Sequence, residues 1–249
     1  MMTEHQNPSI NENTRRLRAA VRTIMSPAVW LLAAYQAALL MLMRVNLSGF
    51  GKNVETLYGP LVFTVLFMGL FFLAGGTYQS FASSRSLVQI PTVIANGRKI
   101  FSNFILLSIK VGLLGLVVIN VLVLVAQGFS GLAPEEIIKT YARYLTLIVA
   151  GLALVFVYWL PLVFVRGNFR LFETLSEALT VGRKRLPQVG FPAALILLPP
   201  AILAIFPGGT HALISIAISV AGELMAWVAY VYCVDYLQTS GKHTETPRE

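Results

Sequence analysis

The chain has 249 residues, of which 56% are apolar and 12% are charged. A soluble domain carries about a quarter charged residues, so this composition excludes an ordinary soluble enzyme, a disulfide-rich secreted domain and a disordered tail. Nineteen Lys and Arg residues against 11 acids give a net charge of +8. Because these cations flank apolar runs, they indicate membrane orientation and not a nucleic-acid partner. The single cysteine forms no disulfide or metal cluster, and we expect no cofactor.

Six apolar stretches are long enough to cross a membrane. A spanning helix needs roughly 20 apolar residues, because the hydrocarbon core is about 30 Å thick and each residue rises about 1.5 Å. The fold class predicted is therefore an all-α transmembrane bundle of about six spans. Residues 1–23 would form a basic cytoplasmic segment, 24–237 the membrane domain and 238–249 a cytoplasmic tail. The predicted spans are 27–43, 57–77, 101–126, 141–164, 188–206 and 212–237.

The loops between these spans differ in charge. One side holds 14 Lys and Arg residues and the other holds four, while Lys110 lies inside the third span. Positive loops stay in the cytoplasm, so both termini are expected there, as an even number of spans requires. The first apolar run lacks a small-residue cleavage site, and we expect a retained span and no signal peptide. We place Ser26 as the N-cap of this span and Pro27 as its first helical residue.

Amphipathic segments are predicted on the cytoplasmic side. Residues 14–24 place Leu17, Val21 and Ile24 on one helical face among arginines. Such a helix suits the surface of an anionic leaflet. A plain positive flank of the first span is the alternative that we favour.

A short motif occurs twice, at an offset of 85 residues. The sequence Gly-Arg-Lys at 97–99 recurs at 182–184, and each copy is expected to form a basic turn before a span. In the second copy Phe172, Leu175 and Leu179 share one helical face, as in a helix lying in the membrane interface. Chance similarity of two basic loops remains open. The cations expected to contact lipid headgroups are Arg98, Lys99, Arg183, Lys184 and Arg185.

Glu223 is the most informative single residue, because it lies near the middle of the sixth span. A lone carboxylate there is costly unless it is protonated, paired or in contact with water. We consider a polar intramembrane site for substrate or cations, with Lys110 and Asn120 as candidate partners. The alternatives are a single buried hydrogen bond that fixes helix packing, and a Lys110 side chain that extends to the interface.

Two adjacent prolines, Pro199 and Pro200, lie in the fifth span. Each removes a backbone donor, so we expect the helix to kink or break here. Broken helices line substrate sites in transporters, which adds both prolines to the candidate substrate site. A kink whose backbone groups are satisfied by neighbouring helices is the favoured alternative.

Catalytic signatures are missing from the sequence. Gly128-Phe129-Ser130-Gly131 has the form seen in rhomboid proteases, but no matching histidine motif accompanies it. There is no zinc-binding histidine motif, no P-loop spacing and no carboxylate pair suited to hydrolysis. We therefore expect no enzymatic activity.

A cytoplasmic stretch carries a loose family resemblance. The residues Leu175-Ser176-Glu177-Ala178-Leu179, followed by a basic turn at 182–185, resemble bacterial inner-membrane proteins of the YciC type. They also resemble the membrane domain that precedes some glycerophosphodiester phosphodiesterases. The resemblance implies a multi-pass protein of the bacterial inner (plasma) membrane with no established activity. We expect a non-enzymatic envelope scaffold or accessory protein in contact with membrane lipids, with a small transporter or permease subunit as the alternative. A second copy or another membrane protein as partner remains open.

Overall fold

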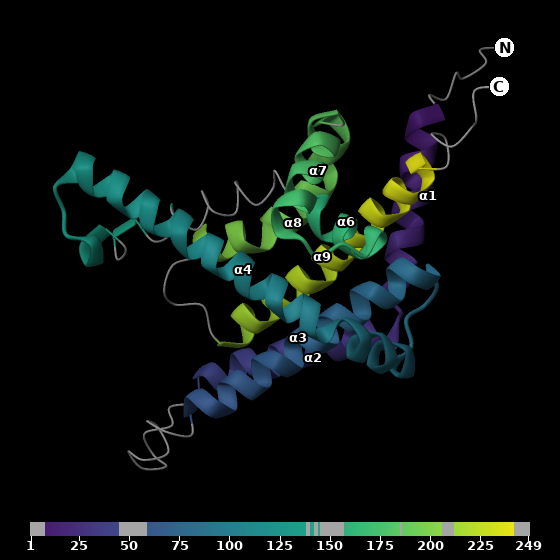
Figure 1. Ribbon diagram of the computed structural model, residues 1–249, viewed down its shortest axis with the longest axis horizontal. Helices are drawn as coiled ribbons and strands as arrows, with labels where there is room; N and C mark the ends of the chain where they lie inside the picture. Colours follow the sequence, from purple (N-terminus) through teal and green to yellow (C-terminus); the bar gives the residue numbers. More distant parts are fainter. Residues whose placement is uncertain are drawn as a thin grey trace.

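The computed structural model describes residues 8–44, 59–137, 140, 141, 144, 157–184, 186–205 and 212–241. This part of the chain is helical and contains no strand, which confirms the all-α prediction (Figure 1). The helices are α1 (Pro8–Thr23), α2 (Pro27–Arg44), α3 (Gly59–Ser84), α4 (Ile90–Ser130), α6 (Trp159–Arg166), α7 (Leu171–Lys184), α8 (Leu186–Ile205) and α9 (Ala212–Gly241).

Three of the described helices, α3, α4 and α9, are long and apolar enough to cross a membrane. Even α3, with 26 residues, reaches about 39 Å and exceeds the hydrocarbon thickness of about 30 Å. Helices α1 and α2 pass the same test only when taken together, and they are bent by 67°. The chain is therefore a helical membrane protein with three candidate spans, or four with α2. The count of six stays a prediction, because most of 141–164 lies outside the described residues.

Local sequence signals explain where several helices begin and end. Helix α2 begins at Pro27, as predicted, but the hydroxyl of Ser26 accepts a hydrogen bond from the backbone N–H of Val88 and not from α2. Helix α4 ends at Gly131 and α6 at Gly167, both with positive φ angles of 68° and 64°. Glycine adopts this left-handed conformation without a steric penalty.

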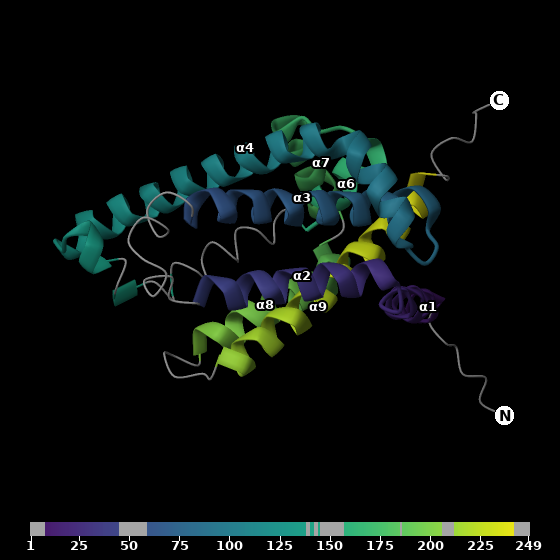
Figure 2. The ribbon, with the colours of Figure 1, turned by 90° about the horizontal axis from the view of Figure 1, so that it is seen from below.

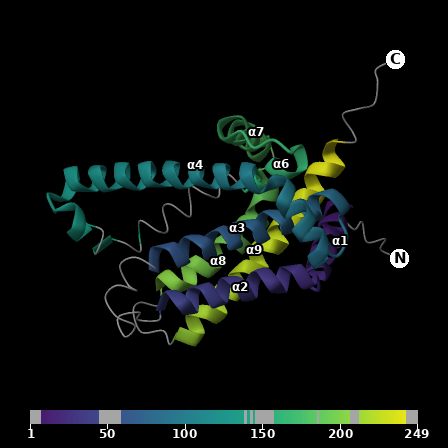
Figure 3. The ribbon, with the colours of Figure 1, turned by 60° about the horizontal axis from the view of Figure 1, so that its bottom comes forward.

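The helices pack around α9, which contacts α1, α2, α6 and α8. Helices α3 and α4 pack along each other, and Figure 3 shows that α4 continues well beyond the rest of the bundle. Figure 2 shows α1, the connection between α3 and α4, and the last turns of α9 at one end of the molecule. Helix α2 ends and α3 begins at the opposite end.

We call the first of these ends the basic end, because exposed cations gather on the helices there. Ser26 links α2 to the segment before α4, and the Gln238 amide donates a hydrogen bond to the carbonyl of Ala82 over 3.0 Å. The exposed cations of the basic end are Arg15, Arg18, Arg22, Arg85, Arg98 and Lys99, and α6 and α7 carry four more exposed cations, Arg166, Arg170, Arg183 and Lys184.

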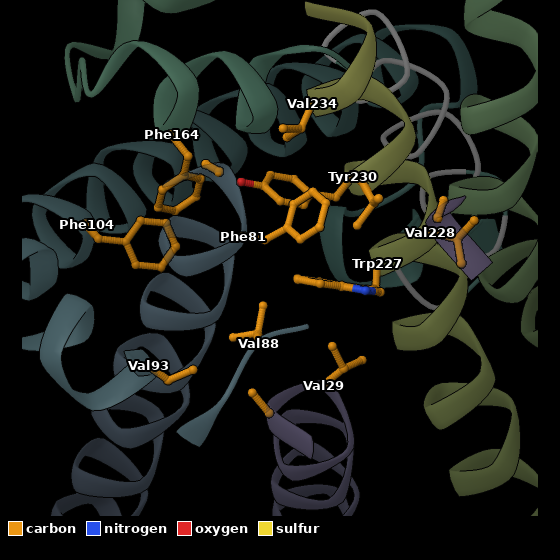
Figure 4. Close-up of a cluster of buried hydrophobic side chains, with 14 residues drawn as sticks. Val29, Phe81, Val88, Val93, Phe104, Phe164, Trp227, Val228, Tyr230 and Val234 are labelled. Atoms are coloured by element: carbon orange, nitrogen blue, oxygen red, sulfur yellow. The ribbon is translucent and has the colours of Figure 1, made fainter. Parts of the chain in front are cut away.

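The main core also lies toward the basic end. Trp227 and Tyr230 of α9 pack against Phe81 of α3, with ring centroids 5.5 and 6.4 Å from that of Phe81. Figure 4 shows the rings of Phe104 and Phe164 beside them. By contrast, only 6% of the most apolar stretch of α4 is buried. An apolar surface of that extent suits lipid and not water.

Helices α3 and α4 approach most closely at two glycines. A Cβ atom on Gly76 would collide with the backbone carbonyl of Val93 and lie 3.2 Å from the backbone nitrogen of Gly97. The expected basic turn at 97–99 is therefore wrong, because α4 is continuous from Ile90 to Ser130 and buries Gly97 against α3. Only the second Gly-Arg-Lys copy lies at the end of a helix, α7.

Candidate functional site

Glu223 lies on α9 and faces α3. Its carboxyl lies near the Tyr78 hydroxyl, and its side chain is half-buried. The Tyr78 ring packs against Trp227 and Tyr230, with ring centroids 5.9 and 4.6 Å apart. The Tyr230 hydroxyl donates a hydrogen bond of 2.8 Å to the backbone carbonyl of Tyr78. The carboxyl thus sits at the margin of an aromatic cluster that joins α3 to α9.

Helix α8 passes α9 beside this carboxyl. A Cβ atom on Gly222 would lie 3.0 Å from the Cβ of Pro199, so the two helices are in close contact there. Helix α8 is continuous from Leu186 to Ile205, so it does not break at the two prolines, and a kink there stays a prediction. The missing side chain of Gly222 leaves room for the Pro199 ring, and such neighbours make a proline tolerable inside a membrane helix. The side chain of Pro200 lies outside the described residues.

The other candidate partners of Glu223 lie elsewhere. Lys110 is exposed on α4 and lines a groove together with Arg170 and Glu173 of the α7 region. Asn120 is also exposed, and its amide donates a hydrogen bond of 2.8 Å to the carbonyl of Leu116 on its own helix. The structure therefore brings Gly222, the neighbour of Glu223 in the chain, close to Pro199, but it does not assemble Lys110 and Asn120 around Glu223.

Tyr78 is a neighbour of Glu223 that the sequence did not reveal. No spacing rule connects a tyrosine on α3 to a carboxylate 145 residues later, and only tertiary packing brings them together. A weak signal exists for the rest of the cluster, because Trp227 and Tyr230 are three residues apart and share one face of α9.

Helix α1 is fixed to α9 by polar contacts. The Nε of Arg16 lies 3.5 Å from a carboxylate oxygen of Asp235, and the guanidinium stacks over the Tyr236 ring at 5.2 Å. The indole N–H of Trp227 donates a hydrogen bond of 2.9 Å to the hydroxyl of Thr23. Asp235 thus anchors α1 to α9.

The packed face of α1 also differs from the predicted one. Leu17 and Ile24 pack against the core, but Val21 is exposed, because the buried face follows Arg16, Ala20 and Thr23. Polar partners on α9 set this rotation of the helix, and hydrophobic periodicity does not encode them.

Helix α7 packs through a different face from its most apolar one. Leu171, Thr174 and Ala178 are buried, and the indole N–H of Trp159 donates a hydrogen bond of 2.9 Å to the Thr174 hydroxyl. Of the predicted apolar face, Leu175 packs against the core, whereas Phe172 and Leu179 remain 76% and 43% exposed. The helix therefore leaves two large apolar side chains exposed.

Four of the five predicted headgroup contacts are exposed cations: Arg98, Lys99, Arg183 and Lys184. Arg185 lies outside the described residues. Arg166, on the neighbouring α6, is paired with Glu177 of α7 over 3.4 Å. Such exposed pairs contribute little stability, so the cations stay available to other anions.

Within the described ranges, no group of His, Cys, Asp and Glu side chains is arranged to hold a metal ion. Ser130 of the rhomboid-like motif donates its hydroxyl to the carbonyl of Ala126 over 2.7 Å. Comparison of the chain with protein-family models, with curated proteins and with solved structures gives no match.

Proposed function

We propose that the chain is a six-span protein of the bacterial inner membrane with both termini in the cytoplasm. In this proposal it acts without catalysis, as an envelope scaffold or accessory protein whose basic end contacts the anionic cytoplasmic leaflet. The YciC-type resemblance is part of this proposal. The positive-inside rule supports the orientation, because the exposed cations of the described chain gather at the basic end.

The observation that carries the proposal is a pair of exposed apolar side chains on α7. Phe172 and Leu179 are exposed on a helix that ends in two exposed cations, Arg183 and Lys184. An amphipathic helix of this kind lies in the interface, with its apolar face among acyl chains and its cations near headgroups. Helix α1 has the matching geometry, since it carries exposed arginines and is bent by 67° from the apolar α2.

A fluorescence experiment tests the placement of α7. An environment-sensitive dye is attached to Phe172→Cys in a Cys233→Ala background, and the protein is reconstituted into vesicles of phosphatidylethanolamine and phosphatidylglycerol. The matched control is Ser176→Cys, an exposed polar position on the same helix. Quenching at position 172 by a lipid-attached quencher, and at position 176 by iodide, supports the proposal. Iodide quenching at both positions contradicts it.

A transporter or permease subunit is the second candidate, favoured by a half-buried carboxyl inside a membrane helix. Native mass spectrometry of the protein released from nanodiscs separates the two functions, with wild type beside Glu223→Gln. A small molecule that is lost only in the variant makes Glu223 a binding residue. An unchanged set of bound molecules makes it a packing residue against Tyr78, as the scaffold proposal requires.

A further inference from the structure

A groove of about 600 Å³ lies between α4 and the beginning of α7. Leu113, Leu114 and Val117 of α4 form its apolar wall, and they are 57%, 36% and 59% exposed. Lys110 and Arg170 also line it. The groove therefore combines an aliphatic wall with two cations.

The α4 side of the groove is one straight stripe. Lys110 is followed by aliphatic residues three, four and seven positions later, so all four lie on one face of the helix. At about 1.5 Å per residue the stripe extends about 10 Å from the cation. Its polar and apolar parts follow each other in the order of a phospholipid headgroup and its acyl chain.

The stripe lies in the apolar part of α4. After Lys110 the helix contains no other charged residue as far as Ser130, and these 20 residues extend about 30 Å. Lys110 is therefore the last cation on a helix whose apolar surface is almost entirely exposed.

The charges of the groove favour an anion. Lys110 forms no ion pair with any of the described carboxylates, whereas Arg170 approaches Glu173 over 3.5 Å. Both partners of that pair are mostly exposed, so it is weak and Arg170 can contact another anion. The groove is therefore lined by two cations and one carboxylate, and its net charge is positive.

We propose that this groove is a binding site for a phospholipid with an anionic headgroup. The headgroup phosphate contacts Lys110 and Arg170, and an acyl chain lies along Leu113, Leu114 and Val117. The proposal rests on the proposed membrane function and adds to it a specific ligand class and site. Phe172 lines the α7 side of the groove and is 76% exposed, so its ring covers part of the bound acyl chain.

Native mass spectrometry tests the site with protein released from nanodiscs of equal phosphatidylethanolamine and phosphatidylglycerol. Lys110→Gln removes the unpaired cation, and Leu113→Trp fills the groove without changing charge. Lys184→Gln is the comparison variant, because it removes a cation that contacts headgroups in the proposed function but lies outside the groove. We expect about fivefold less retained phosphatidylglycerol in Lys110→Gln, the effect of one lysine beside an anionic surface. We expect a similar loss in Leu113→Trp and a clearly smaller loss in Lys184→Gln.

If wild type and Lys110→Gln retained the same amount of phosphatidylglycerol, the proposed site would be wrong. It would also be wrong if Lys184→Gln lost as much phosphatidylglycerol as Lys110→Gln, since charge alone would then explain binding. Loss of both lipids alike in Lys110→Gln would also overturn it, because the headgroup would not be recognised. The fluorescence test of α7 does not depend on Lys110. If α7 is quenched by lipid while Lys110→Gln keeps its phosphatidylglycerol, the groove proposal alone fails.

Discussion

Replacement of Gly76 by alanine should separate α3 from α4. The added Cβ would collide with the backbone carbonyl of Val93 and lie 2.9 Å from its Cγ1. A backbone atom cannot rotate away as a side chain can, so the two helices must move apart. Overpacking of this kind costs about 1–3 kcal/mol, and we take the upper value because the obstacle is backbone.

Alanine also favours helix over glycine by about 1 kcal/mol, which offsets part of this cost. We therefore expect Gly76→Ala to lower the free energy of unfolding by about 2 kcal/mol, roughly a thirtyfold change in the folded-to-unfolded ratio. Gly112→Ala is the matched control on α4, because no atom of the described chain lies within 4 Å of its added Cβ. This control should be neutral or gain up to about 1 kcal/mol.

The native cysteine provides the assay. Cys233 is the only cysteine and is fully buried, so a thiol-reactive dye labels it only when the bundle opens. Labelling during heating in mild detergent gives the midpoint of unfolding for each variant. If Gly76→Ala and Gly112→Ala unfold at the same temperature, the close contact of α3 and α4 does not exist and the reasoning is wrong.

The same labelling assay checks three further predictions. Asp235→Asn should lower the free energy of unfolding by about 1–2 kcal/mol, because it removes the negative charge beside Arg16, which is mostly buried, from a pair that is partly exposed. An unchanged midpoint of unfolding would show that α1 is not anchored there. Thr23→Val should cost about 1–3 kcal/mol by leaving the buried indole N–H of Trp227 unpaired, whereas Thr23→Ser should keep the wild-type midpoint. Glu223→Gln should change stability by less than about 1 kcal/mol, since the amide keeps the size and polarity of the carboxyl beside Tyr78. A larger loss would mean that the charge itself supports the fold.

Hydropathy predicted the membrane helices but not their full length. Helix α4 runs from Ile90 to Ser130 where 101–126 was expected, and α3 ends at Ser84 and not near residue 77. Hydropathy reports the part of a helix that contacts lipid, whereas a helix continues as long as packing supports it. At the basic end Gly76 and Gly97 pack α3 on α4 beyond the apolar stretch.

The candidate site was less predictable than the fold. The sequence singled out Glu223 because a carboxylate in an apolar run is unusual, but its neighbour Tyr78 is set by tertiary contact alone. Lys110 was considered as its partner, whereas the structure places Lys110 in the groove beside Arg170. The rotation of α4 about its own axis decides between these positions, and an almost uniformly apolar helix carries no signal for it.

The orientation of the bundle is the central claim, and three single cysteines test it most directly in a Cys233→Ala background. Spheroplasts carrying Leu132→Cys, Ser176→Cys or Gly208→Cys are treated with a membrane-impermeant maleimide before and after permeabilisation. Six spans with a cytoplasmic basic end predict labelling of positions 132 and 208 in intact spheroplasts, and of position 176 only after permeabilisation. Labelling of position 176 in intact spheroplasts, or of 208 only after permeabilisation, would contradict the account.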